Sequence, residues 1–205
     1  MKAFAYIVSA VFAYFVSGLN PAIIMSNAIY KKDIRSCGSG NPGFTNFKRV
    51  FGNRYAWFVF VLDILKGAVI SVAAGLLFRA YAGSWALGVA YAGLFAMLGH
   101  AFPVYYGFKG GKGFLVCLST VWFIDWRAGA IATAVLVIML PLTKYMSLST
   151  MSALVAGAVS VAAFGGGLAV SIMYAVCVLF VIARHKQNIV RLVKGTESKF
   201  SFGKK

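Results

Sequence analysis

Three polar stretches of the sequence carry residue types that bind phosphate. The first runs from Asp33 to Arg49 and combines glycines, neutral hydrogen-bond donors and a guanidinium. Glycine lets the backbone approach a ligand closely, and an arginine can bind an oxyanion through two parallel N–H bonds. The groups here that suit a phosphate are Gly38, Ser39, Gly40, Asn41, Gly43, Thr45, Asn46 and Arg49. The alternative is an ordinary connection in which Thr45 or Asn46 caps a helix.

The second stretch, residues 99–113, ends where an apolar segment begins. Two lysines bracket a pair of glycines there: Lys109, Gly110, Gly111 and Lys112. The free N–H groups and the dipole at a helix N-terminus favour an anion, so this loop also suits a phosphate. Its spacing differs from the G-x-x-x-x-G-K-[ST] loop, which disfavours a nucleotide triphosphatase. The alternative is a loop whose lysines only set membrane orientation.

The third stretch, Arg184–Arg191, continues out of the last apolar segment as an expected helix. Helical spacing puts Arg184, Asn188 and Arg191 on one face, with His185 and Asn188 as neighbours three positions apart. Together these groups could reach back toward the membrane surface. The alternative is a basic cluster that only ends a membrane span.

Three further polar residues fall within apolar segments. Asp63 and Lys66 are three positions apart on one expected helix, and at that depth each is costly unless paired, so we expect an ion pair. A role in positioning the first polar stretch is the alternative for this pair. His100 is either a base or a hydrogen-bonded structural residue.

The composition requires these stretches to be held by membrane helices. Of the 205 residues, 61% are apolar and only 12% are charged, which excludes a soluble domain and a disordered chain. The three cysteines form no metal or disulfide spacing, so we expect no metal and no cofactor. We therefore expect an all-α polytopic integral membrane protein forming a single domain over residues 1–205.

About seven transmembrane helices are expected, some of them short or broken. The first contains Pro21, which should kink it, and the last four are short and separated by thin breaks. The expected segments are Phe4–Ile29, Tyr55–Phe78, Trp85–Pro103, Phe114–Trp126, Ala128–Leu142, Leu148–Phe164 and Leu168–Ala183.

The basic residues predict the orientation of these helices. With seven crossings, 16 of the 20 Lys and Arg residues, Lys204 and Lys205 included, fall on one side, against Lys2, Arg79 and Arg127 on the other. Basic residues gather in cytoplasmic loops, so the N-terminus is expected outside and the C-terminus in the cytoplasm. Because the net charge of +16 is spread over these loops, we do not expect nucleic-acid binding.

The three stretches together resemble the bacterial glycerol-3-phosphate acyltransferases of the PlsY type. The resemblance covers most of the chain and rests on blocks that occur in the family's order. The blocks are Gly38–Asn46, followed by Asp63–Gly67, then Gly99–Gly113 and Arg184–Arg191.

The resemblance implies acyl transfer from acyl phosphate to the 1-hydroxyl of sn-glycerol 3-phosphate at the bacterial inner membrane. The products are 1-acylglycerol 3-phosphate and phosphate, and the site faces the cytoplasm. The implied catalytic residues are Ser39, Arg49, Lys112 and His185, and the implied substrate-binding residues are Gly38, Gly40, Asn41, Thr45, Asn46, His100, Lys109, Gly110, Gly111 and Asn188. Among these, Arg49, Lys109 and Lys112 would hold phosphates, and His185 with Asn188 would lie near the reacting carbonyl.

Direct transfer is the expected mechanism, since residue 105 is Tyr and residue 190 is Val, so neither histidine has an Asp five positions on. The proton would leave to a substrate phosphate oxygen or to His185. Ser39 as a covalent nucleophile is the alternative mechanism. The alternative function is a transporter or channel for a phosphorylated anion, which the absence of a sequence repeat disfavours.

Overall fold

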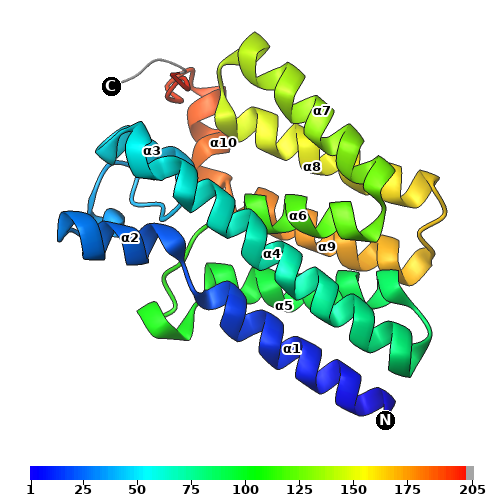
Figure 1. The fold of residues 1–205 in the computed structure, drawn as a ribbon. Coiled ribbons are helices and arrows are strands. Elements are labelled where there is room, and N and C mark those ends of the chain that lie inside the picture. The colour runs from blue at the N-terminus through cyan, green and yellow to red at the C-terminus, as the bar shows by residue number, and fades with distance from the viewer. Residues whose placement is uncertain (202–205) are drawn as a thin grey trace.

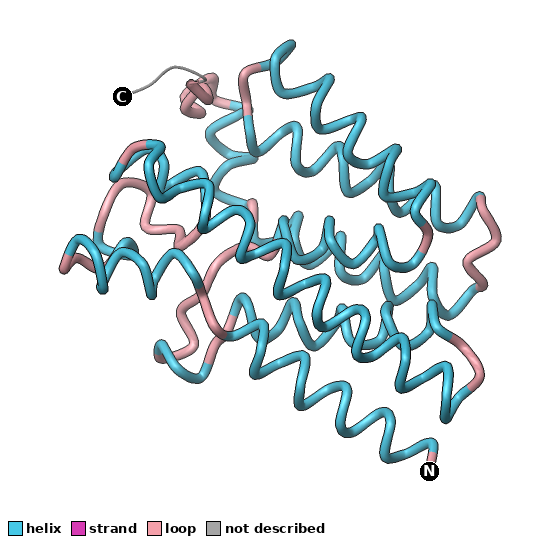
Figure 2. Tube along the Cα trace, in the orientation of Figure 1, coloured by secondary structure: helices cyan, strands magenta, loops and turns pink. Residues whose placement is uncertain are grey.

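The apolar segments form a bundle in which successive long helices run in opposite directions (Figure 1). The structure is a computed structural model, and it describes residues 1–201. The helices are α1 (Lys2–Gly18), α2 (Pro21–Tyr30), α3 (Phe44–Phe51), α4 (Asn53–Ala82), α5 (Trp85–Ala101), α6 (Phe114–Ile124), α7 (Trp126–Thr143), α8 (Met146–Ala163), α9 (Leu168–Arg184) and α10 (Lys186–Val193), with short 3₁₀ turns at Ile34–Ser36 and Val104–Tyr106. The described residues are otherwise loops and turns (Figure 2).

A helix break replaces the kink expected in the first segment. α1 ends at Gly18 and α2 begins at Pro21, which takes the first helical position, where its missing N–H is not needed. The side chain of Asn20 caps the new helix by accepting a bond of 3.1 Å from the backbone N–H of Ile23. The expected continuous helix Phe4–Ile29 is therefore two helices.

The short apolar helix α6 lies at the centre of the bundle. It packs against α4, α5, α7, α8 and α9, and its residues Leu115–Val121 are all buried. A helix that is apolar on every side is stable only when neighbours surround it. Its 11 residues extend about 16 Å, too short to cross a hydrocarbon core of about 30 Å alone.

Within residues 1–201, five helical segments are long and apolar enough to cross a membrane: Lys2–Tyr30, Asn53–Ala82, Trp85–Tyr106, Trp126–Thr143 and Met146–Ala163. A sixth is obtained if α9 and α10 are counted together, although they bend by 59° at His185. The sequence prediction placed a continuous helix through this point, and the bend corrects it. Every expected apolar segment is helical, and the ends differ by a few residues.

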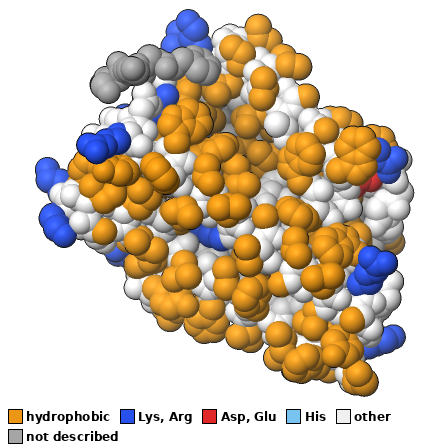
Figure 3. All heavy atoms as spheres, viewed as in Figure 1, with side chains coloured by type: hydrophobic (Ala, Val, Ile, Leu, Met, Phe, Trp, Pro, Cys, Tyr) orange, Lys and Arg blue, Asp and Glu red, His pale blue; other side chains and the backbone are white. Residues whose placement is uncertain are grey.

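The two ends of the bundle differ in what they carry. The long connections 31–43 and 102–113 lie at the same end as α3 and α10, and the N-terminus lies at the other (Figures 1 and 2). On the face shown in Figure 3, apolar side chains dominate the middle and most of the visible cations lie toward the edges. The three polar stretches are thus brought to one end, as expected. Lys204 and Lys205 lie outside the described residues.

Candidate active site

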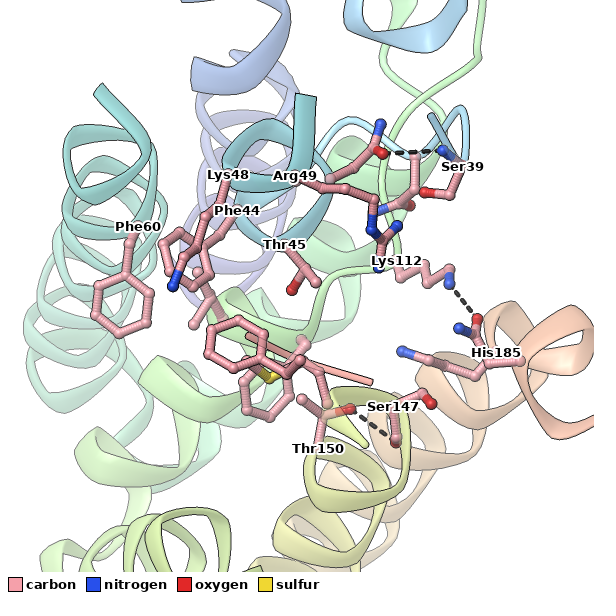
Figure 4. A pocket seen from close by; sticks show the side chains of 18 of the residues that line it. Ser39, Phe44, Thr45, Lys48, Arg49, Phe60, Lys112, Ser147, Thr150 and His185 are labelled. Atoms are coloured by element: carbon pink, nitrogen blue, oxygen red, sulfur yellow. Dashed lines mark hydrogen bonds between the residues drawn. The ribbon is translucent and has the colours of Figure 1, made fainter. Parts of the chain in front are cut away.

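A cavity of about 670 Å³ opens between α3, α4, α6, α7, α8 and α10. One part of its lining is polar and comes from all three of the polar stretches. The other part is apolar and includes Trp57, Phe60, Leu136, Val137 and Leu140. Arg49, Lys112 and His185 extend into the same space from three different elements (Figure 4). The cavity therefore joins a cationic end to a hydrocarbon-like end.

The first polar stretch is shaped by Asn46, which is almost fully buried. Its Oδ1 accepts a bond of 2.9 Å from the backbone N–H of Ser39, and its Nδ2 donates to the carbonyl oxygen of Cys37 at 2.9 Å. Gly38 has a φ of +58°, which lets the chain turn tightly against this amide. Asn46 thus holds the loop that presents Ser39 and Asn41, while Arg49 follows one turn later on α3.

The glycines of the second stretch are packed against the end of α5. The N–H groups of Gly110 and Gly111 donate to the carbonyl oxygens of Ala101 and His100, each at 3.0 Å. A Cβ atom at either glycine would collide with His100. This close approach fixes the path of the chain to Lys112, whose Nζ donates to Oδ1 of Asn188.

Lys109 and Lys112 line different pockets, although both were expected to hold phosphates in one site. Lys109 lies in a shallow neighbouring pocket together with Gly40 and Gly110. The guanidinium of Arg35 crosses this region and donates to the carbonyl oxygens of Tyr106 and Lys109 at 2.7 and 3.3 Å. Gly111 lines neither pocket. The remaining expected site residues line the main cavity.

His185 lies at the bend between α9 and α10 and is almost fully buried. Its Nδ1 is 2.8 Å from the carbonyl oxygen of Val181. Because a carbonyl can only accept, Nδ1 carries the proton, and in the neutral ring Nε2 keeps its lone pair. The ring can therefore accept a hydrogen bond or a proton from a molecule in the cavity.

The expected ion pair between Asp63 and Lys66 is present, with 2.8 Å between Oδ1 and Nζ, and both side chains are buried. Lys66 also donates to the carbonyl oxygens of Ser17 and Leu19 at 3.1 Å and contacts Nδ1 of His100 at 3.0 Å. The ammonium thus holds the end of α1, α4 and α5 together. His100 lines the cavity, with Nδ1 accepting from Lys66.

Comparison with known proteins identifies the family. The sequence profile described as "Glycerol-3-phosphate acyltransferase" matches residues 7–195. Glycerol-3-phosphate acyltransferases of Francisella philomiragia and Francisella tularensis subsp. holarctica are 39% and 38% identical over 189 residues, covering 92% of this chain and 90% of each relative. The chain belongs to the glycerol-3-phosphate acyltransferase family. It is thus an acyltransferase of the PlsY type that acts in phospholipid synthesis and lies in a membrane.

The fold agrees with two solved structures of PlsY (YgiH), an integral membrane glycerol 3-phosphate acyltransferase. Its glycerol 3-phosphate form has a TM-score of 0.87 to this chain and 29% identity, with 96% of each chain covered. Its lysophosphatidic acid form has a TM-score of 0.84 and 29% identity, with 96% of this chain and 95% of that chain covered. The acyltransferase shares the whole fold of these proteins.

Several cavity residues of the acyltransferase were not predicted as site residues, among them the polar residues Ser147, Thr150, Arg191 and Glu197. Glu197 is the centre of the group. Its carboxylate accepts from Ser147 Oγ at 2.7 Å, from Asn188 Nδ2 at 2.6 Å and from Arg191 Nε at 2.7 Å. A signal was available, because Glu197 is one of four carboxylates in a chain of net charge +16 and follows a basic helix closely.

The cationic end of the acyltransferase cavity shifts the pKa values of its own groups. Burial lowers the pKa of the Lys112 ammonium to about 8; Glu197 opposes this shift, and Arg191, Arg184 and Arg49 add to it. Burial alone would raise the pKa of the Glu197 carboxyl, but bonds from Asn188, Ser147 and Arg191 hold it below its ordinary value. The site thus keeps Glu197 ionised and leaves Lys112 close to titration at neutral pH.

Proposed function

We propose that this acyltransferase transfers an acyl group from acyl phosphate to the 1-hydroxyl of sn-glycerol 3-phosphate. The products are 1-acylglycerol 3-phosphate and inorganic phosphate. The observation that carries the proposal is one continuous cavity lined by cations at one end and by aromatic and aliphatic side chains at the other. Two phosphorylated reactants and one acyl chain need both environments within reach of each other.

The phosphate groups are bound at the cationic end. Arg49 offers a two-pronged guanidinium, Lys112 an ammonium, and Ser39, Asn41 and Thr45 offer neutral donors. His100, Lys109 and the loop glycines are proposed to contribute by holding the chain around these groups. Each negatively charged oxygen gains most from a donor that is already directed toward it, because little rearrangement is needed when the oxygen binds.

The acyl chain occupies the apolar end. Phe60 from α4 and Leu136 and Leu140 from α7 line this part, and its outer members Trp57 and Val137 are 54% and 63% exposed. Exposed apolar side chains on membrane helices face lipid. The chain of the donor can therefore remain among hydrocarbon while its phosphate reaches the cationic end.

The reaction proceeds by direct attack. The hydroxyl oxygen of glycerol 3-phosphate forms a bond to the carbonyl carbon, and the bond from that carbon to the phosphate oxygen breaks. Nε2 of His185, or a substrate phosphate oxygen, takes the hydroxyl proton, and phosphate leaves. The acyl phosphate is already activated, so positioning and charge neutralisation supply the catalysis, and we propose neither a metal nor a cofactor.

The protein lies in the bacterial inner membrane with this cavity toward the cytoplasm and the N-terminus outside. The distribution of basic residues supports this orientation, because the polar loops and α10 gather at the end of the bundle opposite the N-terminus. Seven passes are proposed, with the short α6 enclosed by its longer neighbours. A cysteine introduced at position 2, labelled with an impermeant reagent on intact spheroplasts, tests the orientation.

The function is tested with the detergent-purified full chain. With acyl phosphate and glycerol 3-phosphate, we expect equal amounts of lysophosphatidate and released phosphate. Omission of either reactant should stop product formation. Phosphate uptake into proteoliposomes without any lysophosphatidate would instead favour the anion transporter and remove the proposal.

A further inference from the structure

The end of the described chain folds back over the cavity. After α10, residues Gly195–Ser201 form a segment, here named the C-terminal strap, that is fixed at two sites. The N–H of Phe200 donates to the carbonyl oxygen of Lys144 at 2.6 Å, and Nζ of Lys48 donates to the carbonyl oxygen of Ser201 at 2.9 Å. The strap therefore connects α3 to the turn between α7 and α8, next to the cationic end.

The strap places one carboxylate among donors from two helices. Glu197 has a side chain that is only 7% exposed, and it accepts bonds from Ser147 on α8 and from Asn188 and Arg191 on α10. Both of its oxygens are used, one by Ser147 and Asn188 and the other by Arg191. Three donors that face the cavity are thus directed by a single group.

The position of Glu197 decides which way the Asn188 amide points. Because a carboxylate only accepts, it must face the NH₂ group of Asn188, which turns Oδ1 to the other side. Oδ1 is the atom that accepts the bond from Lys112. If the amide were reversed, its NH₂ group would face the Lys112 ammonium, and two donors would oppose each other.

We propose that Glu197 is a positioning residue that directs Lys112 into the cavity through the Asn188 amide. This inference rests on the proposed function. It gives a role to a residue that need not touch the substrate. Among the described residues, the Glu197 carboxylate accepts hydrogen bonds from Ser147, Asn188 and Arg191, and Arg49, Lys112 and His185 are left to face the phosphates.

The charge of Glu197 also bears on Lys112. The charged and titratable groups that face Lys112 are Glu197 from the strap, Arg191 from α10, Arg184 from α9, Arg49 from α3 and His185 at the bend. All except Glu197 are cationic or become so on protonation. Removing its carboxylate leaves the ammonium of Lys112 among like charges and so favours the neutral amine.

The test compares Glu197→Gln, which keeps the shape and removes the charge, with the wild-type chain. The side-chain amide of glutamine has one accepting oxygen and one donating NH₂ group, so either the Asn188 or the Arg191 contact is lost. We expect kcat to fall about tenfold or more, with a smaller change in the KM for glycerol 3-phosphate. The alkaline limb of the kcat/KM profile should move to lower pH. Glu197→Asp, which keeps the charge, should restore that limb.

Asp125→Asn is the matched control. Asp125 pairs with Arg127 at 2.7 Å in the turn between α6 and α7, at the end of the bundle away from the cavity (Figure 1). It removes the same charge from a similar carboxylate–arginine pair, and we expect it to leave kcat and the pH profile unchanged. A loss of stability in Glu197→Gln would lower the amount of folded enzyme and would not move the alkaline limb.

A double-mutant cycle tests the route through Asn188. In an Asn188→Ala background, Glu197→Gln should lower kcat less than about twofold further, because the amide that it directs is gone. Full multiplicative losses would overturn the proposal. So would a Glu197→Gln enzyme as fast as wild type, or faster, since a faster enzyme would mean that the carboxylate competes with substrate.

Ser147→Ala carries the test if Glu197→Gln does not yield a monodisperse, folded protein in detergent. Ser147→Ala removes one of the three bonds to Glu197 and leaves the charge, so we expect kcat to fall about threefold. An unchanged kcat in Ser147→Ala would overturn the proposal. Activity of the wild-type chain is measured in the same preparation. An inactive wild type refutes the proposed function, whereas an active wild type with an unaffected variant refutes only the role of Glu197.

Discussion

The ammonium of Lys112 donates to the amide oxygen of Asn188 across 76 positions of sequence. This bond joins the glycine loop before α6 to the short helix after the bend at His185, and both elements line the cavity. The second and third polar stretches lie far apart in the sequence, and together they form one wall of the cavity. The predictions below follow from that wall and from the groups that face it.

Arg49→Ala and Lys112→Ala should each lower kcat/KM by at least about tenfold, which corresponds to about 1.4 kcal/mol. Each removes a cation that lines the cavity and is proposed to face the phosphates of the reactants. Initial rates of phosphate release measure the effect. Arg79→Ala, at the last turn of α4 on the other end of the bundle, is the control and should keep the wild-type rate. Wild-type rates in both site variants would remove these residues from the site.

Activity should decline as the pH rises through about 8. Burial lowers the pKa of Lys112 to about 8, so its cationic form is complete below that pH and is lost above it, by about tenfold per unit. The profile of kcat/KM against pH measures this limb. Lys112→Arg should move the limb upward by more than one unit, because a guanidinium stays protonated there. An unmoved limb would assign it to another group.

Ser39→Ala should keep measurable activity, with a loss of about ten- to one-hundredfold for one missing donor. In the part of the chain that the structure describes, neither a carboxylate nor a histidine hydrogen-bonds the Ser39 hydroxyl, and its backbone N–H is held by Asn46. Intact-protein mass spectrometry after rapid quench with acyl phosphate should show the unmodified mass. A Ser39 acyl adduct that forms at the turnover rate would refute direct transfer.

Lys66→Met should destabilise the fold by about 3–5 kcal/mol, because it leaves the Asp63 carboxylate buried without its partner. It also removes the donor to the end carbonyls of α1. Thermal unfolding in detergent measures the change. The double variant Asp63→Asn with Lys66→Met should recover part of the loss, and a double variant less stable than Lys66→Met alone would show that the pair is not what stabilises this region.

The positions of the helices, and the gathering of the polar stretches at one end of the bundle, could be predicted from the sequence. Long apolar runs and the position of basic residues depend on composition over many residues, and the segments around α4, α7 and α8 were placed within a few residues. A kink at Pro21 was predicted, but a complete break between two helices there and the bend at His185 were not. Both are accompanied by local hydrogen bonds, from the Ile23 N–H to the Asn20 side chain and from His185 to the Val181 carbonyl, that a pattern of residue types does not specify.

The site was predicted less completely than the fold. Arg49, Lys112, His185 and Asn188 do line one cavity, but Lys109 was grouped with Lys112 because the two are close in sequence. The packing of Gly110 and Gly111 against His100 sends the two lysines to different sides. Glu197 was overlooked because its role arises from contacts with Ser147 and Asn188, and no local spacing relates a carboxylate to a serine 50 positions earlier.

The arrangement of α4 and α7 around α6 bears on how a molecule with one tail enters and departs. Both helices pack on α6, and their side chains Trp57 and Val137 form the outer margin of the cavity. Under the proposed function, a single-chain lipid would enter sideways between these two helices, while glycerol 3-phosphate would reach the cationic end from water. The lipid and the polar reactant would then follow separate routes that meet only at the reacting carbonyl.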